Sequence, residues 1–165
     1  MAKPKRIFVV GHMGAGKALL AEALAKKLGW TYIDANPSLE RYVGRSLHEI
    51  LGKQGEEAFH ECEAEIISHY IEKDHVVVVM EEAVIATEKN RKLLSPECVI
   101  YLKVSTPTQI ERMASGRIPL LPIANLKTFL DKLHHERDSF FEEVATLTIE
   151  SASVEDDVNK IMKSF

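Results

Sequence analysis

Residues 7–18 read Ile-Phe-Val-Val-Gly-His-Met-Gly-Ala-Gly-Lys-Ala, an apolar run that leads directly into a glycine-rich turn. Gly11, Gly16 and Lys17 have the spacing of the phosphate-binding loop G-x-x-x-x-G-K-[ST], in which backbone N–H groups and the lysine hold phosphate oxygens. The stretch therefore predicts a buried strand, a phosphate-binding loop and a helix whose positive N-terminal end faces the same anion. The residues expected to contact a nucleotide are Gly11, Met13, Gly14, Ala15, Gly16, Lys17 and Ala18.

Position 18 departs from this motif, because Ala18 stands where a serine or threonine hydroxyl would bind Mg²⁺. Mg²⁺ prefers an octahedron of oxygen ligands, and a methyl group supplies none, although a water molecule could take that place. We therefore expect ATP or ADP as the bound nucleotide and a weakened Mg²⁺ site. Two alternatives remain for Ala18: tight binding of Mg·ATP is kept, or it is lost.

The composition is typical of one globular domain. The chain has 165 residues, of which 45% are hydrophobic and 28% charged, and its net charge of −4 gives no reason to expect nucleic acid or an anionic membrane as a partner. The basic N-terminus is followed by an apolar run too short for a signal peptide or a membrane span. Cys62 and Cys98 lack the spacing of metal ligands, so we expect a reducing, cytoplasmic location.

Apolar strand-like segments alternate with helical segments along the whole chain. The expected strands are 6–10, 30–34, 75–80, 98–104 and 146–150. The expected helices are 16–28, 37–43, 46–51, 56–73, 89–94, 107–114, 126–141 and 154–164, with a loop at 115–125. This alternation predicts a single domain spanning residues 1–165, a three-layer α/β/α sandwich around a five-stranded parallel sheet of the P-loop NTPase type.

Five blocks of sequence carry a resemblance that covers nearly the whole chain. They are Gly-His-Met-Gly-Ala-Gly-Lys at 11–17, Tyr-Ile-Asp-Ala-Asn at 32–36, Gly-Glu-Glu-Ala-Phe-His-Glu-Cys-Glu at 55–63, Pro-Leu-Leu at 119–121 and Glu-Arg-Asp-Ser-Phe-Phe-Glu-Glu-Val-Ala at 136–145. In this order and spacing they resemble the shikimate kinases, within the nucleoside-monophosphate-kinase branch of P-loop proteins. The resemblance implies a substrate-binding insert at about 35–60, a lid at about 113–124 and ATP-dependent phosphorylation of shikimate.

The resemblance also implies roles for residues that this chain keeps. Lys17 and Asp34 would be catalytic, with Asp34 on the side of the metal ion, and Arg112 would contact the purine of the nucleotide. Phe59 and Arg137 would belong to the substrate site, where the arginine binds the substrate carboxylate. From the residues alone, Asp34 could instead be only a helix cap at the end of a strand.

A simpler structural role is open for Arg137, which could form an ion pair with Asp138 or Glu142. The neighbouring His134 and His135 are expected to lie on a solvated helix face.

Other positions of the expected substrate site depart from the family pattern. Asn36 replaces the carboxylate that accepts the proton of the attacking hydroxyl, a contribution worth roughly 10²–10⁴ in rate. His60 replaces a substrate-binding arginine. Ile118 replaces the lid arginine, although the adjacent Arg117 could still reach the substrate.

Glu81 and Glu82 replace glycines of a Gly-Gly-Gly segment, at the place where an anionic substrate would lie. A like charge about 4 Å away at an effective dielectric near 20 costs on the order of 4 kcal/mol. That is about a thousandfold in rate. Two other interpretations remain: the acids merely end a buried strand at the surface, or Glu81 serves as the acid that holds Mg²⁺ after the apolar strand of many P-loop ATPases.

Together these departures favour a degenerate kinase that keeps a nucleotide site, has lost shikimate phosphorylation and acts as a nucleotide-responsive protein or through a protein partner. One alternative is an ATP-dependent kinase for a neutral or cationic small-molecule acceptor. Another is a weak ATPase that uses Glu81 or Glu82.

Overall fold

Five parallel strands form one sheet in the order β2-β3-β1-β4-β5, as seen in a computed structural model that describes residues 3–35, 55–114 and 123–165. The strands are β1 (Arg6–Val10), β2 (Thr31–Asp34), β3 (Val76–Val79), β4 (Val99–Lys103) and β5 (Leu147–Glu150). Strands β1, β3 and β4 are the most apolar, because they lie inside the sheet and are covered on both faces. The predicted five-stranded parallel sheet is confirmed.

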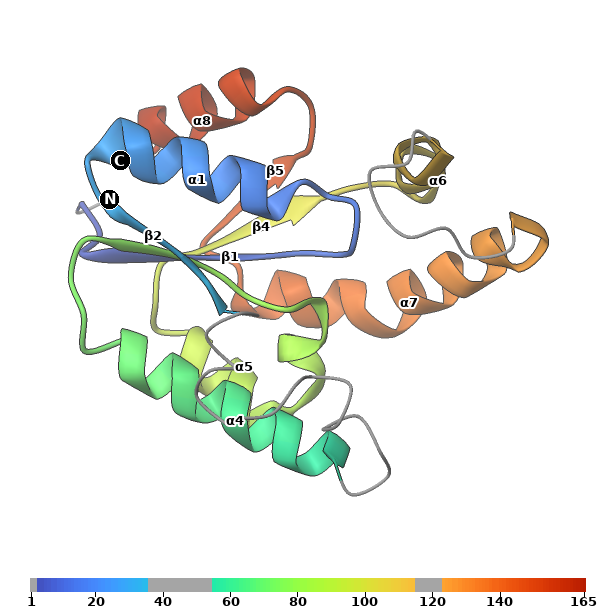
Figure 1. Ribbon diagram of the computed structural model, residues 1–165, viewed down its shortest axis with the longest axis horizontal. Helices are drawn as coiled ribbons and strands as arrows, with labels where there is room; N and C mark the ends of the chain where they lie inside the picture. Colours follow the sequence, from blue (N-terminus) through green and yellow to red (C-terminus); the bar gives the residue numbers. More distant parts are fainter. Residues whose placement is uncertain (1–2, 36–54, 115–122) are drawn as a thin grey trace.

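Helices cover both faces of the sheet, which gives the predicted three layers (Figure 1). On one face lie α1 (Lys17–Leu28) and α8 (Val154–Lys163), and on the other lie α4 (Gly55–Tyr70), α5 (Glu88–Leu94) and α7 (Ile123–Val144). The short α6 (Thr106–Ala114) follows β4 and packs beside α7. Alternate residues of β1 face the two cores: Ile7 and Val9 pack toward α1, whereas Phe8 and Val10 pack with Phe141 of α7.

The structure differs from the sequence-based expectation in two main ways. Helix α7 begins at Ile123, so the last residues of the predicted loop 115–125 are helical. A 3-10 helix, η1 (Glu82–Ala86), follows β3 and was not predicted. The predicted helices 37–43 and 46–51, and most of the insert 35–60 and the lid 113–124, lie outside the described residues. Within the described ranges, none of the helices combines the length and apolarity that a membrane crossing requires.

The loop between β1 and α1 depends on close contact with the neighbouring strand. Gly11 has φ +153°, and a Cβ atom placed there would lie 2.6 Å from the carbonyl oxygen of Leu102 in β4. Only glycine fits this position, because both the backbone angle and the contact exclude a side chain. Helix α1 ends at Gly29, whose φ of +72° lets its N–H reach the carbonyls of Ala25 and Lys26.

These two glycines give a matched pair of substitutions. We expect Gly11→Ala to lower the free energy of unfolding by about 3 kcal/mol or more, because it combines a strained φ with a backbone clash. Gly29→Ala should cost only about 1 kcal/mol, since its Cβ would enter open space and only the left-handed φ is penalised. Urea denaturation measures both, and equal losses would show that the contact with Leu102 is unimportant.

Candidate nucleotide and acceptor site

A pocket of about 510 Å³ lies at the carboxyl ends of the central strands, where the β1–α1 loop turns over the sheet. This is the edge at which parallel α/β sheets bind ligands. Predicted site residues that line it are Met13, Gly14, Ala15, Gly16, Lys17, Ala18, Asp34, Glu81, Glu82 and Arg112. The structure therefore brings together most of the predicted nucleotide and metal residues.

The lysine of the loop is half-buried beside the backbone that would hold phosphate. Lys17 Nζ donates to the carbonyl oxygens of Gly11 at 2.7 Å and His12 at 3.1 Å. Burial lowers the pKa of Lys17, while the negative charges of Glu82, Glu81 and Asp34 act to raise it. The ammonium group is thus placed at the pocket and surrounded by acids.

Arg112 joins α6 to the same loop. Its guanidinium donates to the carbonyl oxygen of Gly14 at 2.6 Å and to Ser151 Oγ at 3.0 Å, and Ser151 Oγ donates to the carbonyl of Ala15 at 2.8 Å. This places Arg112 on the wall of the pocket, beside the segment after β5. Its contact with a purine stays a prediction.

Two carboxylates could supply the oxygen ligands that position 18 lacks. Asp34 ends β2 and Glu81 follows β3, and both line the pocket with Ala18. Because these strands are parallel neighbours, their carboxyl ends bring the two acids to one edge of the sheet. Carboxylate oxygens are suitable ligands for Mg²⁺, so the residues present fit such an ion even without a hydroxyl on the loop.

Glu82 does not end β3 at the surface, contrary to one of the interpretations above, because it is only 8% exposed. Its Oε1 lies 3.0 Å from His12 Nδ1 and 3.6 Å from Arg137 Nη1. Burial acts to raise the pKa of Glu82, but the hydrogen bond from His12 and the positive charges of Lys17 and Arg137 outweigh it and lower the pKa. Arg137 therefore pairs with Glu82 rather than with the expected Asp138 or Glu142.

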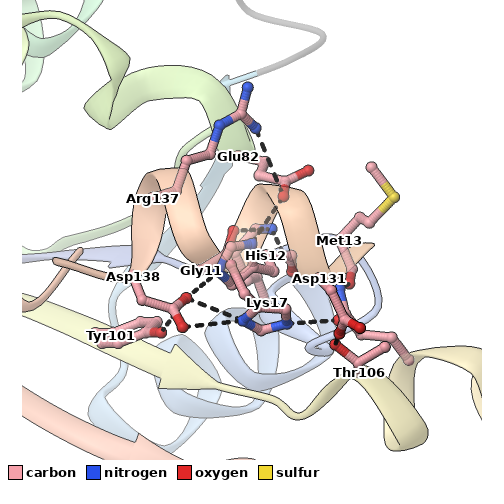
Figure 2. Close-up of polar contacts among 12 residues, drawn as sticks. Gly11, His12, Met13, Lys17, Glu82, Tyr101, Thr106, Asp131, Arg137 and Asp138 are labelled. Carbon is pink, nitrogen blue, oxygen red and sulfur yellow. Dashed lines mark hydrogen bonds and ion pairs between the residues drawn. The ribbon is translucent and has the colours of Figure 1, made fainter. Parts of the chain in front are cut away.

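His12, at an unspecified position of the loop motif, has no exposed surface. Its second ring nitrogen, Nε2, lies 2.5 Å from Asp138 Oδ1, so the imidazole is held between two acids, one on η1 and one on α7 (Figure 2). Figure 2 also shows Arg137 reaching Glu82 from α7. Glu82 and Asp138 are 70 and 126 residues away from His12 in the sequence, so no local sequence pattern predicts these contacts.

The prediction that His134 lies on a solvated face is wrong. His134 Nδ1 lies 2.9 Å from Asp138 Oδ1, and its Nε2 lies 2.8 Å from Gln109 Oε1, which leaves the side chain 16% exposed. His135 is exposed as expected. The i, i+4 spacing of His134 and Asp138 on one helix was a usable signal for their contact.

On α4, His60 Nδ1 lies 2.8 Å from Oε1 of Glu63, a residue that is 2% exposed. Burial, reinforced by the negative charge of Glu81 and opposed by the positive charge of Arg137, raises the pKa of Glu63 to about 9. Glu63 is therefore neutral near pH 7. Of the remaining predicted substrate residues, Asn36 and Arg117 lie outside the described residues, as does the side chain of Phe59.

Comparisons with known proteins agree with this fold and this loop. The family model described as "Shikimate kinase" matches residues 13–165. A shikimate kinase of Legionella pneumophila (strain Corby) is 34% identical over 153 residues, which are 92% of this chain and 87% of the relative. One from Francisella philomiragia is 33% identical over 166 residues, 98% of this chain and 94% of the relative.

Solved structures give the same result. A shikimate kinase from Acinetobacter baumannii in complex with shikimate superposes with a TM-score of 0.85 at 30% identity, covering 99% of this chain and 93% of that one. The shikimate kinase of Aquifex aeolicus, at 22% identity, superposes with a TM-score of 0.78 over 96% of this chain and 94% of that one, which supports the fold. On the match of the family model and of these relatives, the chain belongs to the shikimate kinase family.

Proposed function

We propose that this protein binds ATP or ADP with the phosphates on the loop 11–17, and that transfer of phosphate to shikimate is lost or strongly weakened. The main observation that supports the loss of transfer to shikimate is the ion pair between Glu82 and Arg137. The catalytic and metal roles of Lys17 and Asp34 belong to this proposal. So do the substrate insert at 35–60 and the lid at 113–124.

The proposed binding of ATP or ADP is supported by the geometry of the loop 11–17. Gly14 and Gly16 have positive φ values of 77° and 89°, conformations that allow successive N–H groups to converge on an anion. Lys17 is the first residue of α1, so its side chain and the positive end of the helix act at the same point. ATP would place its phosphates there, and Mg²⁺ would find oxygen ligands on Asp34 and Glu81.

The proposed loss of phosphate transfer to shikimate is supported by the negative charges at the acceptor site. In the family, an arginine at the position of Arg137 binds the substrate carboxylate, and here Glu82 already provides that arginine with a buried carboxylate. A shikimate carboxylate would have to displace Glu82 from Arg137, or share the arginine with it, and would then lie close to the buried negative charge of Glu82. Glu81 adds another acid on the same wall, and Asn36 cannot accept a proton from the attacking hydroxyl.

A second candidate is phosphate transfer to a neutral or cationic acceptor, or to water. It is supported by Glu81, which lines the pocket with Asp34 and Lys17 and would offer a carboxylate to a metal ion. Glu82 fits the water-orienting role less well, since its Oε1 is engaged by His12 and Arg137. Loss of shikimate transfer would equally leave a nucleotide-responsive protein that acts through a protein partner.

The first test concerns nucleotide binding. Calorimetric titration with ATP and with ADP, each with and without Mg²⁺, should give one site per chain, and Lys17→Ala should weaken it at least tenfold because a charged phosphate contact is removed. Lys27→Ala, on the exposed last turn of α1, is the matched control and should bind like the wild type. Absence of binding at millimolar nucleotide would refute the proposal.

The second test concerns shikimate. Kinases typically turn over at about 1–100 s⁻¹, and we expect shikimate-dependent ADP formation here to be at least about a thousandfold slower because of the added acids. Glu82→Gln should bind shikimate at least tenfold more tightly than the wild type, since Arg137 is then released from a charged partner. Glu88→Gln, an exposed acid on α5, is the control and should change nothing. Wild-type turnover in the ordinary kinase range would contradict this half.

The third test uses the raised pKa of Glu63. In the unfolded chain this carboxyl loses its proton near pH 4.5, whereas in the folded protein it keeps the proton up to about pH 9. The folded state therefore binds more protons than the unfolded state in this window, and stability falls as pH rises. We expect the free energy of unfolding of Glu63→Gln, relative to that of the wild type, to rise by more than about 1 kcal/mol between pH 5 and pH 9. Urea denaturation at a series of pH values measures this difference. A constant difference across that range would contradict a neutral Glu63.

A further inference from the structure

The two imidazoles of His12 and His134 lie against each other, with ring centroids 4.0 Å apart. All four of their ring nitrogens face acceptor oxygens. His12 Nδ1 faces Glu82 and His134 Nε2 faces Gln109, whereas His12 Nε2 and His134 Nδ1 both face Asp138. The side-chain oxygen of Gln109 is fixed in this direction because its amide nitrogen donates to the carbonyl of Met13 at 2.8 Å.

If only hydrogen bonds hold these side chains together, the arrangement has an electrostatic cost. Satisfying all four acceptors requires a proton on every ring nitrogen, so both imidazoles would be cations in near contact. A single carboxylate, Asp138, would then stand between them. If either ring is neutral instead, one of its nitrogen lone pairs faces an acceptor oxygen. A cation shared by the two inner nitrogens and Asp138 removes both problems.

We propose that His12 Nε2, His134 Nδ1 and a carboxylate oxygen of Asp138 form a binding site for a divalent transition metal ion of the zinc class. The three ligand atoms all lie within 4.8 Å of one another. In a tetrahedral zinc site such atoms are separated by about 3.3 Å. His134 Nδ1 and Asp138 Oδ1 are already 2.9 Å apart, so small side-chain movements bring the set to that spacing. Two imidazoles and one carboxylate favour zinc over Mg²⁺, which prefers oxygen ligands.

The groups behind the two histidines match those of metal centres. In such centres the ring nitrogen that does not bind the metal donates to a carboxylate or carbonyl oxygen, which fixes the tautomer. Here Glu82 would accept from His12 Nδ1–H, and Gln109 would accept from His134 Nε2–H. Both outer partners are buried, at 8% and 0% exposure. The metal site is thus supported from residues on η1 and α6 as well as by its own ligands.

The site is also accessible. A second pocket, of about 390 Å³, is lined by His134 and Asp138 together with residues that follow β4 and β5. Asp138 is 35% exposed, so an ion and a fourth, water ligand can enter from this side. None of the three ligands lines the nucleotide pocket. The proposed ion is therefore separate from the Mg²⁺ that would accompany ATP, and it would join the phosphate-binding loop to α7.

The test is metal binding by the full chain after treatment with a chelator, using Zn²⁺ and Co²⁺ salts as probes. We expect one ion per chain by calorimetry, and for Co²⁺ a visible absorption spectrum of a four-coordinate site. His134→Ala and Asp138→Asn should weaken binding at least about hundredfold and remove that spectrum. Gln109→Leu, which removes only an outer partner, should weaken binding about 10–100-fold.

His135→Ala is the matched control, because it removes an exposed histidine next to His134. It should bind both ions like the wild type. Since His134 and Asp138 are partly exposed, their variants should fold, and circular dichroism checks this. No stoichiometric site in the wild type, or unchanged Co²⁺ spectra in folded His134→Ala and Asp138→Asn, would overturn the proposal. Weak binding lost equally with His135→Ala would identify only an adventitious ion and overturn it too.

Discussion

The buried imidazole of His12 is the interaction on which the arrangement of this site depends. It has no exposed surface, so both ring nitrogens must find partners within the protein. Glu82 and Asp138 supply them, and each is then fixed in place for its other contact, with Arg137 and His134 respectively. One side chain on the phosphate-binding loop thus links the loop to both η1 and α7.

This arrangement links the structural role of Glu82 to the proposed loss of shikimate transfer. Glycine at position 82 would leave His12 Nδ1 and Arg137 without a carboxylate, and an incoming carboxylate could then bind the arginine. Glutamate supplies that carboxylate from within the chain, with His12 as its second partner. The same residue therefore joins the loop, the 3-10 helix and α7, and in the proposed function it would compete with an acidic acceptor.

The fold was predictable because its signals are local. Apolar runs such as Val76–Val79 identify buried parallel strands, and Gly11, Gly16 and Lys17 fix the loop and the start of α1. The site was predictable only where the motif itself provides the residue. The contacts of His12 join residues far apart in sequence, so the pattern around position 12 carries no information about them. Likewise η1 is too short to show a periodicity.

The charges around Lys17 bear on the meaning of Ala18. Asp34, Glu81 and Glu82 all act on this lysine, and Glu82 also contacts His12 and Arg137. Asp34 and Glu81 line the pocket beside this loop. Carboxylates there would repel a bound polyphosphate unless a cation lay between them. In the proposed function, a nucleotide bound here would therefore need a divalent ion because of Asp34 and Glu81. With no hydroxyl at position 18, we propose that these carboxylates, at the carboxyl ends of β2 and β3, would hold that ion in place of the loop.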